Sequence, residues 1–138
     1  MTLRVLTLAT LFPDASRPRL GPFVERQALE LAAHPDVALK VVAPLGLPPF
    51  PLSMHPHYAS RKDLPQRENW KGLDVFRPRF LHWPGLQGRF DGAMLARALL
   101  PLLSDIRRDF AFDVIDAEFF FPDGPAAHQL SVALGVPF

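Results

Sequence analysis

The sequence LFPDASRPRLGPFVERQ occupies residues 11–27 and joins two segments of different character. The run before it, residues 3–9, is almost continuously apolar, which is typical of a strand buried on both faces of a parallel sheet. The run after it, residues 23–33, has the apolar spacing of a helix, and Pro22 suits the first helical position because its missing N–H is not needed there. A strand, a loop rich in proline and glycine, and a helix together predict the opening of a βαβ unit.

The same alternation of strand and helix continues along the chain. We expect a long irregular connection over residues 45–71, and one strand at a sheet edge over residues 73–80, because Pro78 cannot donate to a ladder. The other predicted elements are strands over residues 37–44 and 113–118, helices over 91–110 and 125–134 (the second closed by Gly135), and the start of a strand at 136–138. The sequence therefore predicts an α/β fold, a Rossmann-like parallel sheet with helices on both faces.

Composition and motifs exclude several classes of protein. The chain has no cysteine, which excludes disulfides and thiolate metal sites. It shows no secretory leader and no apolar run of about 20 residues. Neither G-x-G-x-x-G nor G-x-x-x-x-G-K-[ST] occurs, which argues against a dinucleotide-binding domain and a P-loop NTPase. A net charge of +1 without a recognition motif argues against nucleic-acid binding.

The predicted sheet has one edge where ligands are expected, because open α/β sheets bind them at the carboxyl ends of their strands. The loop that ends at Gly21 and the strand tip that carries Glu118 both belong to this edge, so we predict that they converge on one rim. Gly21 precedes a helix N-terminus, where backbone N–H groups attract phosphate, and a simple turn glycine is the alternative. Asp116 shares the strand face of Glu118, and such a like-charge pair raises the pKa of one member.

Four motifs, in this order, resemble the N-terminal half of the GT-B glycosyltransferases, in particular the retaining enzymes of family 4. They are LFP (11–13) with GPFVERQ (21–27), the helix around Leu31 leading to a strand that ends in Ala43-Pro44, FDVIDA (112–117), and FPDGPAA (121–127) with LGVP (134–137). The likeness covers nearly the whole chain. It implies one half of a GT-B fold, in which residues 1–138 form the N-terminal, acceptor-side domain, truncated before the C-terminal domain that binds the donor.

The resemblance also implies roles for residues at the predicted edge. Gly21, Pro22 and Phe23 are expected to bind substrate, because in the family this loop meets the donor diphosphate and the acceptor. Many family members carry a histidine near the position of Glu118 that touches the acceptor or the transferring sugar, and this sequence lacks that histidine. We therefore assign Glu118 a candidate catalytic role, by hydrogen bonding to sugar hydroxyls or by deprotonating an acceptor hydroxyl. A surface carboxylate without a role is the alternative.

Phe119, Asp123 and Gly124 complete the candidate substrate-binding residues. Phe119 is expected in an apolar wall for the acceptor, with core packing as the alternative, and Asp123 is expected to cap the helix that follows it. No cofactor is expected. No metal site is expected either, because His55 and His57 lack a carboxylate or thiolate partner.

Residues 55–90 form a basic segment, with seven Lys or Arg against three Asp or Glu, interleaved with aromatic residues. Such a segment is suited to an anionic membrane surface or a lipid-linked pyrophosphate. A solvated, arginine-rich loop is the alternative.

We therefore expect the acceptor-binding half of a retaining glycosyltransferase, which transfers a sugar from a nucleotide-sugar to a glycan or lipid-linked acceptor in cell-surface polysaccharide or glycolipid assembly. Donor contacts would come mainly from the missing C-terminal domain, so residues 1–138 alone are predicted to be inactive. The expected location is the cytoplasm, with peripheral contact at the inner face of the membrane. A non-catalytic, flavodoxin-like binding or regulatory module is the alternative, because a fold alone does not define a function.

Overall fold

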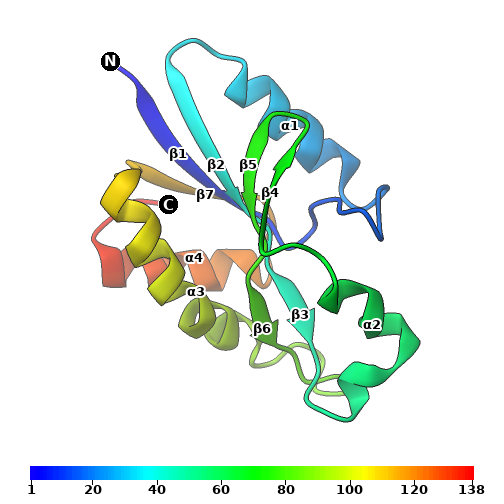
Figure 1. The fold of residues 1–138 in the computed structure, drawn as a ribbon. Helices are drawn as coiled ribbons and strands as arrows, with labels where there is room; N and C mark the ends of the chain where they lie inside the picture. Colours follow the sequence, from blue (N-terminus) through cyan, green and yellow to red (C-terminus); the bar gives the residue numbers. More distant parts are fainter.

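A five-stranded sheet lies at the centre of the computed structural model, which describes residues 1–138 (Figure 1). The strand order is β4-β5-β2-β1-β7, and every pair is parallel except β4 with β5. The strands of this sheet are β1 (Leu3–Leu8), β2 (Val37–Val42), β4 (Arg67–Trp70), β5 (Leu73–Phe76) and β7 (Val114–Ala117). The helices are α1 (Pro22–Ala32), α2 (Pro56–Lys62), α3 (Asp91–Asp109) and α4 (Asp123–Leu134), with a short 3₁₀ turn at Leu52–Met54.

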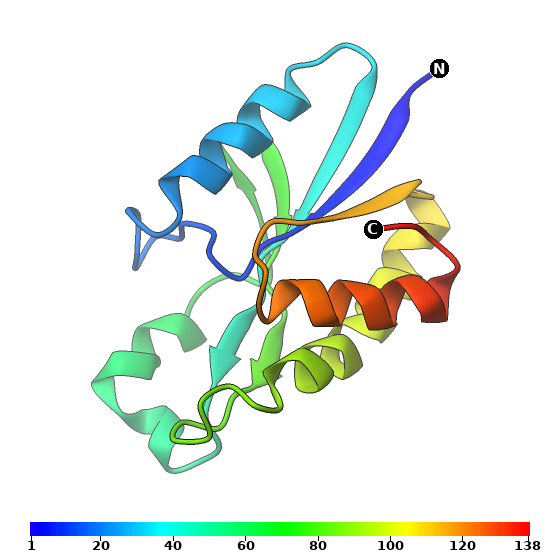
Figure 2. The ribbon, with the colours of Figure 1, turned by 180° about the vertical axis from the view of Figure 1, so that it is seen from behind.

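Helices cover both faces of the sheet, which confirms the predicted fold class. Figures 1 and 2 show α1 on one face and α3 with α4 on the other. Successive residues of a strand point to opposite faces, so Leu6 and Leu8 of β1 join the core with α3 and α4, whereas Ala9 joins Val24 in the core under α1. This two-sided burial explains why the first strand is almost continuously apolar.

A second, two-stranded parallel sheet extends the first one beyond two prolines. Its strands are β3 (Leu45–Leu47) and β6 (Arg79–Leu81), which follow β2 and β5 after Pro44 and Pro78. Each proline lacks an N–H and interrupts its strand, while the carbonyl of Pro78 still accepts a hydrogen bond from the Leu45 amide at 2.8 Å. Figure 1 shows this small sheet below the main one, with α2 beside it.

Two of the sequence-based expectations were therefore wrong. Residues 45–71 are not irregular throughout, because they contain β3, the 3₁₀ turn, α2 and β4. Residues 73–80 are not one edge strand: Pro78 divides them into β5, which lies inside the sheet, and β6. The edge strand is β4, which forms a hairpin with β5 through Lys71 and Gly72, both at positive φ.

The C-terminal part of the chain follows the prediction closely. Helix α3 covers the predicted range to within one residue, and α4 ends at Gly135 but begins at Asp123, two residues earlier than expected. No strand is assigned after Gly135, yet the carbonyl of Pro137 accepts a hydrogen bond from the Ile115 amide of β7 at 2.9 Å. None of the helices combines the length and apolarity needed to cross a bilayer.

Candidate functional site

The loop between β1 and α1 takes a path that only glycine allows at its last position. Gly21 is the N-cap of α1 and has left-handed backbone angles, φ 56° and ψ 50°. A Cβ built on Gly21 would lie 2.0 Å from the carbonyl oxygen of Leu11. Pro22 then begins α1, where its missing N–H leaves no helical bond unmade. The glycine is thus explained by packing, while its contact with a phosphate stays a prediction.

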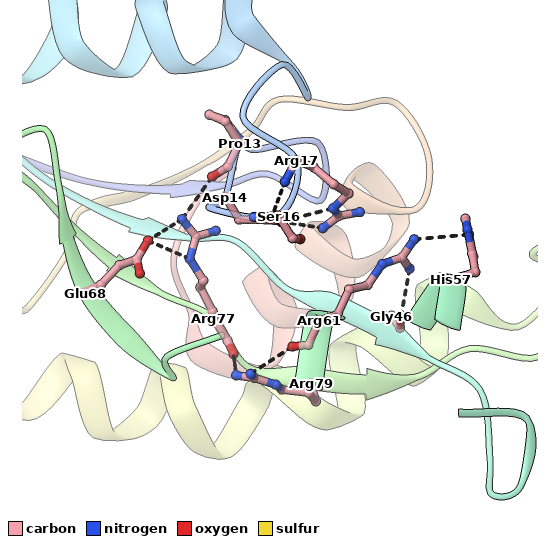
Figure 3. Close-up of polar contacts among 10 residues, drawn as sticks. All are labelled: Pro13, Asp14, Ser16, Arg17, Gly46, His57, Arg61, Glu68, Arg77 and Arg79. Carbon is pink, nitrogen blue, oxygen red and sulfur yellow. Dashed lines mark hydrogen bonds and ion pairs between the residues drawn. The ribbon is translucent and has the colours of Figure 1, made fainter. Parts of the chain in front are cut away.

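Asp14 organises the middle of the same loop, and the sequence analysis did not single it out. Its buried carboxylate accepts hydrogen bonds from the Ser16 amide and hydroxyl, the Arg17 amide, and the Arg17 guanidinium at 2.7 Å (Figure 3). Burial pushes the pKa of Asp14 upward, but the bonds from Ser16 and Arg17 outweigh it and hold this pKa below its usual value. An aspartate two residues before a serine is a recognisable turn pattern, so the sequence did carry a signal.

The structure brings the first helix and the tip of β7 together at the carboxyl edge of the sheet. The Gln27 side chain of α1 donates a hydrogen bond to the Glu118 carboxylate at 2.9 Å. The rings of Phe23 and Phe119 lie 6.5 Å apart, measured between their centroids. The predicted convergence of these two segments on one rim is therefore observed. What the rim binds stays a prediction.

Three carboxylates gather around the end of β7. Burial raises the pKa of Glu118 to about 7, helped by a hydrogen bond with Asp116 and by the negative charges of Asp116 and Asp123. Asp116 also accepts a hydrogen bond from the Thr7 hydroxyl of β1, at 3.2 Å. A glutamate with this pKa exchanges its proton near neutral pH, as a general acid or base must.

Asp123 is fully buried and does not cap α4, contrary to expectation. Its carboxylate accepts hydrogen bonds from the amide and the hydroxyl of Thr10, at 3.1 and 2.7 Å, and so joins the start of α4 to the end of β1. Burial raises the pKa of Asp123 to about 6, although the bonds from Thr10 oppose the shift. The neighbouring Gly124 amide donates to the Phe119 carbonyl at 3.0 Å. In this structure both residues shape the loop rather than reach outward.

An apolar cavity of about 1030 Å³ opens beside this loop. Phe119 and Phe120 line it together with Gly124 and residues of β7. The Phe120 side chain is 95% exposed, so core packing does not account for it. The cavity is suited to an apolar ligand group, and the apolar wall for an acceptor stays a prediction.

The basic segment is only partly a solvated surface. Arg77 is fully buried, where it contacts the Glu68 carboxylate at 2.8 Å and the Pro13 carbonyl at 2.9 Å (Figure 3). His55 has a local role, because its Nδ1 accepts a hydrogen bond from the His57 amide at the start of α2. No group of three or more His, Cys, Asp or Glu side chains is arranged to hold a metal ion.

The fold and this rim define a Rossmann-like α/β domain with a candidate ligand edge. Neither the protein-family models nor the solved structures give a match. One curated protein does match: the chain is 29% identical over 138 residues to "Putative teichuronic acid biosynthesis glycosyltransferase TuaC" of Bacillus subtilis (strain 168). The match covers 99% of this chain and 35% of that protein, so the chain spans about a third of its relative's length. The chain is thus similar, over almost its whole length, to part of a protein whose name describes a glycosyltransferase.

Proposed function

We propose that this chain is the acceptor-side half of a retaining glycosyltransferase of the GT-B fold and family 4. In this proposal, the protein transfers a sugar from a nucleotide-sugar to a glycan or lipid-linked acceptor. The observation that carries the proposal is the meeting of α1 and β7 at the carboxyl edge, where Gln27 contacts Glu118. Ligands bind at this edge in open α/β sheets. The similarity to a glycosyltransferase over 99% of the chain supports the choice of reaction.

Glu118 is the proposed proton acceptor for the acceptor hydroxyl. Its pKa of about 7 keeps a fraction of the carboxylate ionised at neutral pH, while the carboxylate remains basic enough to take a proton. Gln27 fixes the direction of the carboxylate by donating to Oε1. Gly21, Pro22 and Phe23 supply the opposite side of the rim, and the exposed Phe120 extends an apolar wall for the acceptor.

The donor is proposed to bind mainly to a second domain that faces this rim. The chain spans 35% of its Bacillus relative, which leaves room for such a domain in a protein of similar length. The printed name of that relative refers to teichuronic acid biosynthesis, and we propose a comparable place in cell-surface polysaccharide or glycolipid assembly. Residues 1–138 alone are proposed to lack transferase activity, with the full-length protein located at the cytoplasmic face of the membrane.

A donor screen on the full-length protein tests this proposal. We expect release of nucleoside diphosphate from one member of a nucleotide-sugar panel when a glycan or lipid-linked acceptor is present. Glu118→Gln should lower kcat by about 10² to 10⁴, the usual range for a lost general base. Glu30→Gln is the matched control, since Glu30 lies exposed on α1, and its activity should be unchanged. Acceptor binding without turnover of any donor would favour a non-catalytic binding module instead.

Peripheral membrane contact is proposed for two loops that leave the same end of the small sheet. The loop after β3 exposes Phe50 and Met54, and the loop after β6 exposes Trp83 and Phe90. The segments 45–62 and 77–90 contain no Asp or Glu, so cations such as Arg89 face an anionic surface without compensation. Aromatic and basic residues together are typical of the membrane interface.

Sedimentation with vesicles tests the membrane contact. The full-length protein should bind vesicles of phosphatidylglycerol more strongly than vesicles of phosphatidylcholine. The double variant Phe50→Ser/Trp83→Ser should bind at least fivefold less. Val132→Ser, which changes an exposed apolar residue on α4, should bind as the wild type does. Equal binding of both variants would contradict the proposed surface.

A further inference from the structure

A second cavity, of about 270 Å³, lies on the side of β1 where the small sheet begins. It is lined by Thr10 and Arg17 from the loop after β1, by Gly46 of β3, by Arg61 of α2, and by His82 after β6. Two guanidinium groups from elements distant in the sequence therefore border one small space (Figure 3). The role proposed above for Glu118 makes no use of this cavity.

Arg17 is held firmly at one wall of the cavity. Its Nε and Nη2 atoms both donate to Asp14, at 3.1 and 2.7 Å, and Asp14 is itself buried. These bonds use one edge of the guanidinium and leave Nη1 without an intramolecular partner. A planar guanidinium fixed in this way keeps its remaining donors in a defined direction.

Arg61 at the facing wall has no carboxylate partner. Its Nη1 donates to the Gly46 carbonyl at 3.3 Å, its Nη2 lies 3.4 Å from His57 Nε2, and its buried Nε has no hydrogen-bond partner. Burial lowers the pKa of Arg61 and the positive charge of Arg17 lowers it further, while Tyr58 and Asp14 oppose the shift without cancelling it. A partly buried cation beside a second cation is costly unless an anion accompanies it.

Asp14, paired with Arg17, offsets part of the positive charge around Arg61, and Arg79 adds a further cation nearby. Arg79 donates to the carbonyls of Arg61 and Arg77, at 3.1 and 2.7 Å, and has no carboxylate partner either. The carboxylate that lines the cavity is Asp91, which faces His82 Nδ1 at 2.9 Å. That contact occupies His82 Nδ1, and the ring lies at the border of the cavity. Guanidinium donors with few acceptors around them select an anion with several oxygens.

We propose that the cavity between Arg17 and Arg61 binds a phosphoryl group. Guanidinium forks match the spacing of phosphate oxygens, and two of them, with His82 beside them, contact a tetrahedral anion from different sides. We assign this phosphoryl group to the acceptor. This assignment rests on the proposed function, whereas the binding site itself does not. Thr10 lines the cavity and donates to Asp123, whose negative charge acts on Glu118, so the cavity is connected to the rim through one bonded pair.

Calorimetric titration of the full-length protein with inorganic pyrophosphate tests the site. The wild type should bind saturably, and Arg17→Gln and Arg61→Gln should each raise Kd at least tenfold. Arg61→Lys, which keeps the charge but loses the fork, should give an intermediate Kd. Arg97→Gln is the matched control, because Arg97 is exposed on α3 and outside the cavity, and its Kd should equal that of the wild type. Absence of saturable binding, or wild-type binding by Arg61→Gln, overturns the site.

Two further titrations identify the source of the phosphoryl group. Farnesyl phosphate represents a lipid-linked acceptor, and uridine diphosphate represents the leaving group of a donor. Loss of farnesyl phosphate binding in Arg61→Gln, with uridine diphosphate binding unchanged, supports the acceptor assignment; the reverse result overturns it. Neither titration requires turnover, so a protein that binds pyrophosphate through Arg61 but transfers no sugar refutes the proposed function and not this site.

Discussion

Single residues fix the candidate rim through packing and through buried charge. Gly21 lets the loop after β1 pass against the Leu11 carbonyl, and Asp14 gathers the hydrogen-bond donors of the same loop. The pKa of Glu118 is raised to about 7, first because burial penalises its charged form and then because Asp116 lies close by. The sequence predicted this carboxylate pair, since alternate residues of a strand share a face. The turn pattern of Asp14 with Ser16 was visible in the sequence, but the burial of Asp14 was not, because burial of a loop carboxylate depends on the fold around it.

Gly21→Ala should destabilise the protein by about 2 kcal/mol or more, because the new methyl group meets the Leu11 carbonyl and the backbone keeps a positive φ. Urea unfolding at pH 7 measures the change. Gly85→Ala is the matched control: Gly85 also has a positive φ, 88°, but nothing lies within 4 Å of its added Cβ. Gly85→Ala should lower the free energy of unfolding only by the backbone cost of a positive φ, about 1 kcal/mol. Equal losses in the two variants would mean that the close approach to Leu11 contributes nothing.

The raised pKa of Glu118 predicts a pH dependence of stability. The ordinary pKa is 4.5 and the folded value is about 7, so between these values the unfolded chain has released the proton that the folded protein retains. The stability of the wild type therefore falls as pH rises from about 4.5 to 7, relative to Glu118→Gln, which cannot ionise. Urea unfolding of both proteins at several pH values measures the difference. A difference that stays constant with pH would show that Glu118 titrates normally.

At the scale of elements, the end of β1 and the start of α4 are joined by a buried carboxylate. Asp123 accepts both Thr10 donors, and this link holds the loop that carries Phe119 against the sheet. The sequence correctly placed Asp123 at the start of a helix, but it predicted that the carboxylate would bond to the helix backbone. The carboxylate bonds instead to Thr10, which follows β1 and is distant in the sequence. The strands β1, β2 and β7 were predictable as short apolar runs, and the helices α1 and α3 from the helical spacing of their apolar residues.

The small sheet could not be predicted in the same way. β3 and β6 have three residues each and follow a proline directly, so neither shows an alternation that distinguishes a strand from a loop. Their pairing depends on β2 and β5 being neighbours, which is a property of the whole sheet. The hairpin of β4 and β5 did leave a local signal, Lys71-Gly72 between two alternating segments.

Thr10→Val should lower the free energy of unfolding by about 1 to 3 kcal/mol at pH 7.5, because the Asp123 carboxylate loses its hydroxyl donor inside the protein. The loss should be smaller at pH 5, where Asp123, with a pKa of about 6, is mostly protonated and carries no buried charge. Guanidinium unfolding at the two pH values measures both. Thr2→Val, at an exposed position, is the control and should change little. An equal loss at pH 5 and 7.5 would argue against a charged Asp123.

At the scale of the whole molecule, one buried arginine connects the sheet edge with the first loop. Arg77 follows β5, contacts Glu68 of the edge strand β4, and donates to Pro13 in the loop after β1. Its guanidinium also lies 5.9 Å from the Phe12 ring and 5.5 Å from the Trp70 ring. The sequence showed that residues 55–90 are basic, but it did not show that Arg77 within them is buried.

Glu68→Ala should lower the free energy of unfolding by about 3 to 5 kcal/mol, because it leaves the Arg77 cation buried without its carboxylate partner. The double variant Glu68→Leu/Arg77→Met removes both charges and should recover most of that loss. Thermal and urea unfolding measure the cycle. Glu30→Ala breaks an exposed ion pair with Arg26 and should cost under about 1 kcal/mol. A double variant as unstable as Glu68→Ala would mean that the pair acts through packing rather than charge.

The glycine at position 21 can also be used to classify distantly related sequences by the path of their first loop. Any chain that aligns with this one but carries a bulkier amino acid there must lay its first loop along another route, because the Leu11 carbonyl occupies the space. A single letter in an alignment therefore separates sequences to which this loop geometry can be transferred from those that need a structure of their own.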